Sequence, residues 1–217
     1  IRTSQANRTQ SFIKTYRDKN SNVQNIILVS HSYGAWPSSL LVSSYNNEEL
    51  INKFVVIDGV FNLNKSYEGS DNLFLNNNLI RDIAVGVLLH SNYAAKAMLK
   101  KTAFDTRIIE TDENILKTFL VPIKLDNSSK SISDWLNDFV VKGYNSNETT
   151  IEYYRQIKIP TRFVWGIEDT LTPIKDAEVL VQSLRDAKLY RIESVGHMPM
   201  IENYEKFDEA LIRAILE

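Results

Sequence analysis

Four short segments of the chain are rich in apolar residues and predict the strands of one sheet. They lie at residues 26–30, 54–58, 162–166 and 188–193. In the first of them, Ile26 to Val29 follow one another without polar alternation, which is typical of a strand covered on both faces. We therefore predict an α/β fold with a mostly parallel sheet flanked by helices.

Other segments carry apolar residues at the three- and four-residue spacing of amphipathic helices. One helix is predicted over residues 4–19, with Phe12, Ile13 and Tyr16 near one face. A long insertion separates the second and third strands, and asparagine- and serine-rich breaks divide it. Its pattern predicts helices at 79–89, 93–99, 113–120, 132–141 and 150–156.

The predicted helices of the insertion fall between two strands of the same sheet, and no internal repeat is present. The insertion therefore interrupts one domain instead of forming a separate one. The predicted organisation is an α/β core at residues 1–66 and 156–217, with a helical insertion at residues 67–155.

The stretch from Asn25 to Tyr45 combines a strand with a helix and leaves no room for a loop between them. The apolar run ends at Ser30, and Pro37 fits only in the first turn of the helix that follows. The chain must then reverse at Ser32. Such a turn strains the backbone and needs small neighbours, and it lifts the Ser32 hydroxyl to the amino end of the helix, where N–H groups favour developing negative charge.

The sequence Ser30-His31-Ser32-Tyr33-Gly34 resembles the G-x-S-x-G nucleophile elbow of the α/β-hydrolase family, with Ser30 in place of the first glycine. This departure is mild because serine is nearly as small. The resemblance implies that Ser32 is a nucleophile and that the backbone N–H of Tyr33 is one oxyanion donor. It also implies an acid and a histidine later in the chain, in that order.

Two later strand ends carry residues that match this order. The strand at 162–166 is followed by Asp169 within GIEDTLTP, and the strand at 188–193 is followed by His197 within GHMP. The order and spacing of these segments resemble the last two strand and loop units of the family. The resemblance therefore implies a catalytic triad of Ser32, His197 and Asp169.

The residues alone leave alternatives open for the acid. Glu168 is adjacent to the favoured residue, and Asp58 lies past another strand end, where some members of the family place the acid. Asp169 could instead cap the helix that follows it. Of the other two histidines, His31 is expected to pack or to bond locally, and His90 is expected on a helix surface or in the core.

Composition narrows the classes of function. Hydrophobic residues make up 43% and charged residues 24% of the chain, which is typical of a globular protein. A formal net charge of −2 without a Lys/Arg cluster argues against a nucleic-acid partner. With no cysteine and three histidines, we expect no disulfide, metal site or cofactor. No apolar run predicts a membrane span, and the compartment stays open, with the cytoplasm slightly favoured.

The resemblance also implies that the helical insertion forms a cap over the active site. Trp135, Phe139 and Tyr144 are predicted to line an apolar substrate pocket under it, with Tyr153 and Tyr154 as further candidates. The alternative is that most of these aromatic residues pack the cap against the core.

The activity that the resemblance implies is hydrolysis of a carboxylic ester or a related acyl compound, so the expected partner is a small-molecule acyl substrate. The same constellation also serves acyltransferases, hydrolases of carbon–carbon bonds, and ligand-binding modules with little turnover. These alternatives stay open.

The sheet of the resembling family has eight strands, whereas this chain carries the pattern of the last four. We therefore expect the first strands and the second oxyanion donor upstream of Ile1, in the same chain or a companion chain. Without them, the strand at 26–30 would leave an apolar edge unpaired, and such edges promote aggregation.

Overall fold

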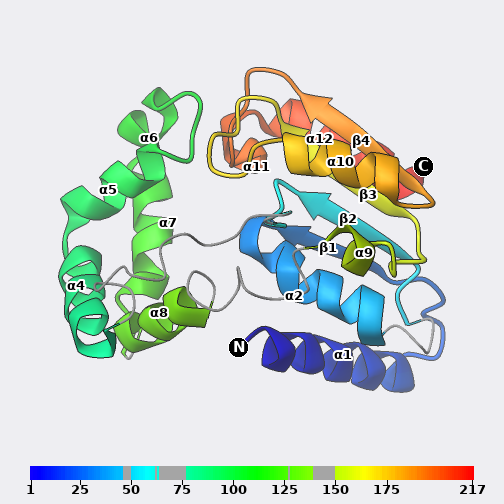
Figure 1. The fold of residues 1–217 in the computed structure, drawn as a ribbon. Helices are drawn as coiled ribbons and strands as arrows, with labels where there is room; N and C mark the ends of the chain where they lie inside the picture. Colours follow the sequence, from blue (N-terminus) through cyan, green and yellow to red (C-terminus); the bar gives the residue numbers. More distant parts are fainter. Residues whose placement is uncertain (46–49, 62, 64–76, 127, 139–149) are drawn as a thin grey trace.

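A parallel sheet forms the centre of the computed structural model, which describes residues 1–45, 50–61, 63, 77–126, 128–138 and 150–217 (Figure 1). In spatial order its strands are β1 (Ile27–His31), β2 (Lys53–Ile57), β3 (Thr161–Gly166) and β4 (Ala187–Ile192). The predicted α/β class with a parallel sheet flanked by helices is confirmed. Each strand boundary lies within one residue of its predicted position.

Helices cover both faces of the sheet. Side chains of its central strands alternate between the two faces and are apolar on both, so each face packs against helices in its own apolar cluster. Phe54 and Val56 of β2 join one cluster, and Val55 and Ile57 join the other. The first cluster includes residues of α1 (Arg2–Lys19), α2 (Ala35–Leu40), α9 (Ile151–Tyr154) and α10 (Lys175–Ser183). The second includes residues of α12 (Tyr204–Leu216).

The helical insertion lies beside the core, toward the end of the sheet where β1 passes into α2 (Figure 1). Its helices are α4 (Asn78–His90), α5 (Asn92–Lys100), α6 (Arg107–Thr111), α7 (Glu113–Ile123) and α8 (Ser128–Leu136). The buried guanidinium of Arg81 ties α4 to α8, because its Nε donates to both the carbonyl and the hydroxyl of Ser133 at 3.0 Å.

The predicted helices of the insertion differ from the structure in three places. The short helix α6 is not predicted from the apolar spacing, and α8 begins four residues before the predicted start at residue 132. The predicted helix at 150–156 is the single turn α9, and its Tyr154 packs in the same cluster as the sheet. The limits of the insertion at residues 67 and 155 stay a prediction.

The first helix buries only part of its predicted apolar face. Ala6 and Ile13, seven residues apart, are buried, whereas Phe12 and Tyr16 are 68% and 46% exposed and stack on each other. Phe12, Ile13 and Tyr16 lie near one face, as predicted, since all three line the same hollow, but only Ile13 is buried in the core. Within the described residues, β1 pairs with β2 alone, and its Val29 is 43% exposed.

Candidate active site

Ser32 lies directly after β1, where the chain turns into a 3-10 helix (Ser32–Gly34) and then into α2. Its φ of 54° is in the left-handed region, which residues with a β-carbon rarely adopt. A β-carbon built at Gly34 would meet the β-carbon of Ser30 at 3.7 Å, an ordinary contact. The strain expected of this turn therefore resides at Ser32, and the turn has room for a β-carbon at Gly34.

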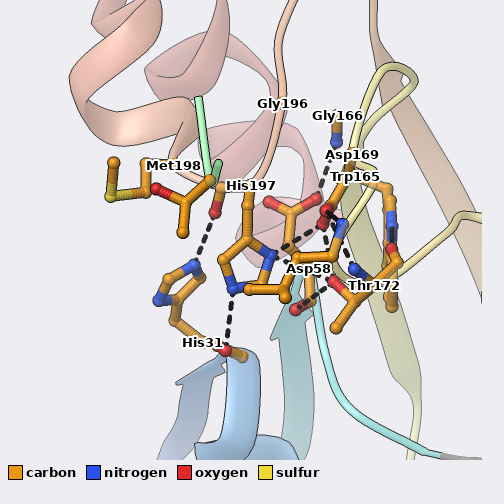
Figure 2. A network of polar contacts seen from close by, with 12 residues as sticks. His31, Asp58, Trp165, Gly166, Asp169, Thr172, Gly196, His197 and Met198 are labelled. Carbon is orange, nitrogen blue, oxygen red and sulfur yellow. Dashed lines mark hydrogen bonds and ion pairs between the residues drawn. The ribbon is translucent and has the colours of Figure 1, made fainter. Parts of the chain in front are cut away.

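Two loops at the same end of the sheet bring a histidine and an aspartate to this serine. His197 follows β4 and Asp169 follows β3, and both are 4% exposed. Nε2 of His197 lies 2.8 Å from Oγ of Ser32. Its Nδ1 lies 2.7 Å from Oδ2 of Asp169 (Figure 2). The structure thus brings together the three residues that the sequence analysis singled out.

The hydrogen bonds of His197 indicate which ring nitrogen faces the carboxylate and which faces the serine. Oδ2 of Asp169 can only accept when that carboxyl is ionised, so Nδ1 of His197 carries the proton. Nε2 is then free to accept the hydroxyl proton of Ser32. A serine hydroxyl that donates to a basic nitrogen is the arrangement that makes it a nucleophile.

The surroundings of Asp169 keep its carboxyl ionised. Burial by itself raises the pKa of this group, but the hydrogen bond and charge of His197 and the hydrogen bonds from Thr172 outweigh burial, so that the pKa lies below its ordinary value. The N–H groups of Leu171 and Thr172 donate to Oδ1 at 2.8 and 2.9 Å. Asp169 therefore holds its own turn as well as the imidazole.

Thr172 was not predicted as part of the site. Its hydroxyl lies 2.6 Å from Oδ2 of Asp169, 3.0 Å from Nδ1 of His197 and 3.0 Å from the carbonyl of Asp58 (Figure 2). Its own carbonyl accepts the indole N–H of Trp165 at 2.8 Å. The signal in the sequence is a hydroxyl residue three positions after the aspartate, where both can hydrogen-bond within one turn.

His31 supports the histidine loop from the strand side. Its Nε2 lies 2.8 Å from the carbonyl oxygen of His197, so this nitrogen carries the proton and donates. Burial lowers the pKa of His31, an effect that the hydrogen bond to this carbonyl partly opposes. His31 therefore bonds to a residue distant in sequence, beyond the local partner that was expected.

The two alternative acids lie elsewhere. Glu168 accepts the N–H of Val195 at 3.0 Å, so it holds the backbone before His197. Asp58 is fully buried, and its Oδ1 accepts the N–H of Gly166 at 2.8 Å. Burial, together with the nearby charges of Asp169 and Glu202, raises the pKa of Asp58 to about 9, against the hydrogen bond from Gly166. A neutral Asp58 without a hydrogen bond to His197 does not match the role of the acid.

Among the aromatic residues predicted to line a substrate pocket, those that are described lie in different parts of the structure. The ring of Trp135 on α8 meets the ring of Tyr33 edge-on at 5.3 Å, so the insertion contacts the residue after Ser32. Tyr154 is fully buried and donates to the carbonyl of Phe61, which places it in the core. Tyr153 packs edge-on against Tyr154, and its hydroxyl accepts a hydrogen bond from Ser43. Phe139 and Tyr144 lie outside the described residues.

Tyr33 extends the site toward the first helix. Its hydroxyl donates to Oε1 of Gln5 at 3.0 Å, and burial together with the charge of Asp138 raises its pKa to about 12. The phenol is therefore neutral at physiological pH. The peptide N–H of Tyr33 lies in the turn that opens the helix, one residue after Ser32.

A comparison with protein families matches residues 8–204 to the family described as alpha/beta hydrolase fold. The chain belongs to the alpha/beta hydrolase fold family. The resemblance inferred from the elbow sequence is thereby confirmed, and the family fold accounts for a serine, an acid and a histidine at three strand ends.

Among curated members of this fold, the chain is similar to monoacylglycerol lipase ABHD6 of Bos taurus, with 28% identity over 57 residues. The aligned part covers 26% of this chain and only 17% of that relative.

Two solved structures of hydrolases share the fold. A serine hydrolase involved in carbazole degradation, CarC, has a TM-score of 0.71 at 16% identity, covering 99% of this chain and 71% of that chain. The meta-cleavage product hydrolase CumD has a TM-score of 0.68 at 14% identity, covering 91% and 67%.

The part of the chain that the structure describes carries neither a helix suited to span a membrane nor a cluster of metal ligands. None of its helices combines the length and the hydropathy that a membrane crossing requires. Nor do three or more histidine, aspartate or glutamate side chains gather there in a way that could hold a metal ion.

Proposed function

We propose that this alpha/beta hydrolase is a serine hydrolase of a carboxylic ester or a related small acyl substrate. The observation that carries the proposal is the chain of two hydrogen bonds from Ser32 through His197 to Asp169, at 2.8 and 2.7 Å. These two hydrogen bonds link a strained serine to an ionised carboxylate through an imidazole. The three residues come from three strand ends in the chain order of the family.

In the first half of the proposed reaction, Oγ of Ser32 attacks the acyl carbonyl carbon while Nε2 of His197 takes the hydroxyl proton. The carbonyl electrons move to its oxygen and form a tetrahedral intermediate. When the carbonyl re-forms, the bond to the leaving oxygen breaks and His197 gives its proton to that oxygen. An alcohol leaves, and the acyl group stays on Ser32.

In the second half, His197 takes a proton from a water molecule as the water attacks the acyl carbon. The bond to Oγ of Ser32 then breaks, and His197 returns the proton to the serine. Asp169 accepts from Nδ1 throughout, which holds the ring in position and stabilises the imidazolium that forms twice in each cycle.

The negative oxygen of each intermediate needs donors, and we assign the peptide N–H of Tyr33 as one of them. Its place directly after Ser32, at the start of the helical turn, supports this role. The helical insertion, residues 67–155, is proposed as a cap, with Trp135 as a substrate contact beside Tyr33. Phe139 and Tyr144 stay proposed contacts on the basis of the sequence.

The proposal is tested with a fluorophosphonate probe and an aryl ester. We expect one phosphonyl adduct on the peptide that contains Ser32, and ester turnover that falls by at least about 10⁴-fold in Ser32→Ala. Ser131→Ala, a change of an exposed serine on α8, is the matched control and should keep full turnover. An adduct-free protein without turnover would refute the hydrolase and favour a ligand-binding module.

A further inference from the structure

The loop that carries His197 is also held from outside the proposed triad. The N–H groups of Gly196 and Met198 each donate to the carboxylate of Glu202 at 3.0 Å. Between them, the N–H of His197 donates to the carbonyl of Thr102 at 2.9 Å. Three consecutive N–H groups are thus bound, two by the last residue of α11 (Pro199–Glu202) and one by the insertion.

The same carboxylate reaches the insertion directly. Phe104, in the segment between α5 and α6, donates its N–H to Oε2 of Glu202 at 2.7 Å. Oε2 also accepts the N–H of Gly196, so one oxygen joins the insertion to the histidine loop. Since charge-assisted hydrogen bonds are about twice as strong as neutral ones, Glu202 is a firm connection between the two segments.

Backbone approaches backbone at this connection. A β-carbon at Gly196 would lie 2.7 Å from the nitrogen of Phe104 and 3.1 Å from the carbonyl oxygen of Thr102. A side chain at this position would therefore push the insertion away from the loop. Glycine at position 196 is what permits the hydrogen bonds to Glu202 and Thr102 to form together.

Apolar packing strengthens the same contact. Met198, the neighbour of His197, is 3% exposed and belongs to a cluster with Leu99 of α5 and Ile109 of α6. The residue after the histidine is thus part of the core of the insertion. Any displacement of α5 and α6 would pull on the backbone of His197.

We propose that Glu202 is a positioning residue for His197, which couples the placement of the insertion to the distance between the imidazole and Ser32. This inference rests on the proposed function, because positioning matters for a reaction at Ser32. Productive geometry at Ser32 then requires both the carboxylate of Glu202 and the N–H of Phe104 to be in place.

Glu202→Gln is the sharpest test because it keeps the size of the side chain and removes one acceptor. Oε1 and Oε2 both accept N–H groups, so an amide NH₂ in either orientation faces at least one N–H donor. The matched control is Glu209→Gln, an exposed residue of α12.

We expect kcat for the aryl ester to fall about 10- to 100-fold in Glu202→Gln, as for a small misplacement of a catalytic group, with KM within about twofold. The proton on Nδ1 of His197, which gives a far-downfield NMR resonance when it is bound to Asp169, should broaden or disappear at a temperature where the variant is still folded. The control should change neither quantity.

A second pair of variants leaves Glu202 intact. Gly196→Ala places a β-carbon against Phe104 and should reproduce the loss of kcat and of the resonance. Gly86→Ala in α4 is its control, because a β-carbon there meets no atom within 4 Å. This pair decides the question if Glu202→Gln does not fold.

The outcomes separate this inference from the proposed function. Wild-type protein without turnover or labelling would refute the proposed function, whereas the resonance of His197 would still report on its position. A lower melting temperature with kcat and resonance unchanged would show that Glu202 serves stability alone and would overturn the inference. A loss of kcat and of the resonance in Glu202→Gln or Gly196→Ala, with both quantities unchanged in the control variants, supports the inference.

Discussion

The hydroxyl oxygen of Thr172 lies 3.0 Å from Nδ1 of His197, on the side of the ring that faces away from Ser32. Because the same hydroxyl lies 2.6 Å from Oδ2 of Asp169, it sits against both partners of the hydrogen bond that orients the imidazole. Thr172 thus completes the contacts of the carboxylate and limits its movement.

We expect Thr172→Val to lower kcat about tenfold, which corresponds to roughly 1.4 kcal/mol, close to the lower end of the range for a hydrogen bond to a charged group. The methyl group of valine fills the space of the hydroxyl but cannot donate to Asp169. Steady-state ester hydrolysis measures the change. Thr172→Ser keeps the hydroxyl and should stay within about threefold of wild type on the same scale; equal losses in both variants would contradict the role.

The two aspartates at neighbouring strand ends should respond differently to amidation. Asp169→Asn exchanges the acceptor of Nδ1 for a group that favours the wrong tautomer, and kcat should fall by about 10⁴-fold, as in a serine protease. Asp58→Asn should stay near wild type, because Asp58 has no hydrogen bond to His197. Parallel kinetics decide between them: a larger loss in Asp58→Asn would make Asp58 the acid.

Asp58 also predicts how stability depends on pH. Its pKa is raised from an ordinary value near 4 to about 9 in the folded protein, first by burial and then by the charges of Asp169 and Glu202, so between these limits the native state holds a proton that the unfolded state has released. The contribution of Asp58 to stability is therefore complete below about pH 4 and is lost as pH rises toward 9.

The measurement is the free energy of unfolding of wild type and Asp58→Asn across this range. The asparagine does not titrate. The free energy of unfolding of Asp58→Asn should therefore rise relative to that of wild type as pH rises, by at most about 1.4 kcal/mol per pH unit. Parallel curves for the two proteins would show that Asp58 is ionised in the native state.

Gly166→Ala should destabilise the protein and slow the reaction together. A β-carbon at this position would lie 2.2 Å from the carbonyl oxygen of Gly196 and 2.5 Å from that of Val195, so the histidine loop must move. We expect a loss of about 1–3 kcal/mol in the free energy of unfolding, as for other overpacked sites. Gly86→Ala, with open space around it, should instead gain up to about 1 kcal/mol from helix propensity. Denaturant unfolding of both variants is the test.

The strands and the proposed triad could be predicted because each depends on local sequence. Apolar runs set the strands, and Ser32, Asp169 and His197 each follow one of them within a few residues. His31 could not be found in this way, since its partner is a backbone carbonyl 166 residues away. The contacts of Thr172 with His197 and of Glu202 with Phe104 also join segments 25 and 98 residues apart, although Thr172 bonds to Asp169 within one turn. The catalytic roles of the three triad residues stay predictions.

The face of the first helix shows a second limit. Apolar spacing grouped Phe12, Ile13 and Tyr16, but the buried side chains are Ala6 and Ile13. Small residues such as alanine allow close approach to α2 and carry little weight in a hydrophobic pattern. The choice between pocket and core for Tyr154 likewise needed the position of Phe61, which lies 93 residues away in sequence.

Three residues other than glycine have a positive φ in the described part of the chain, and each follows the end of a strand: Ser32 at 54°, Asp58 at 42° and Ser194 at 61°. Glycine would adopt these conformations more readily at all three positions. Selection for thermal robustness alone would therefore favour glycine at position 32 and remove the hydroxyl. Under the proposed chemistry, residue 32 has opposite requirements for activity and for stability. A library of variants screened only for heat resistance should therefore become enriched in inactive protein.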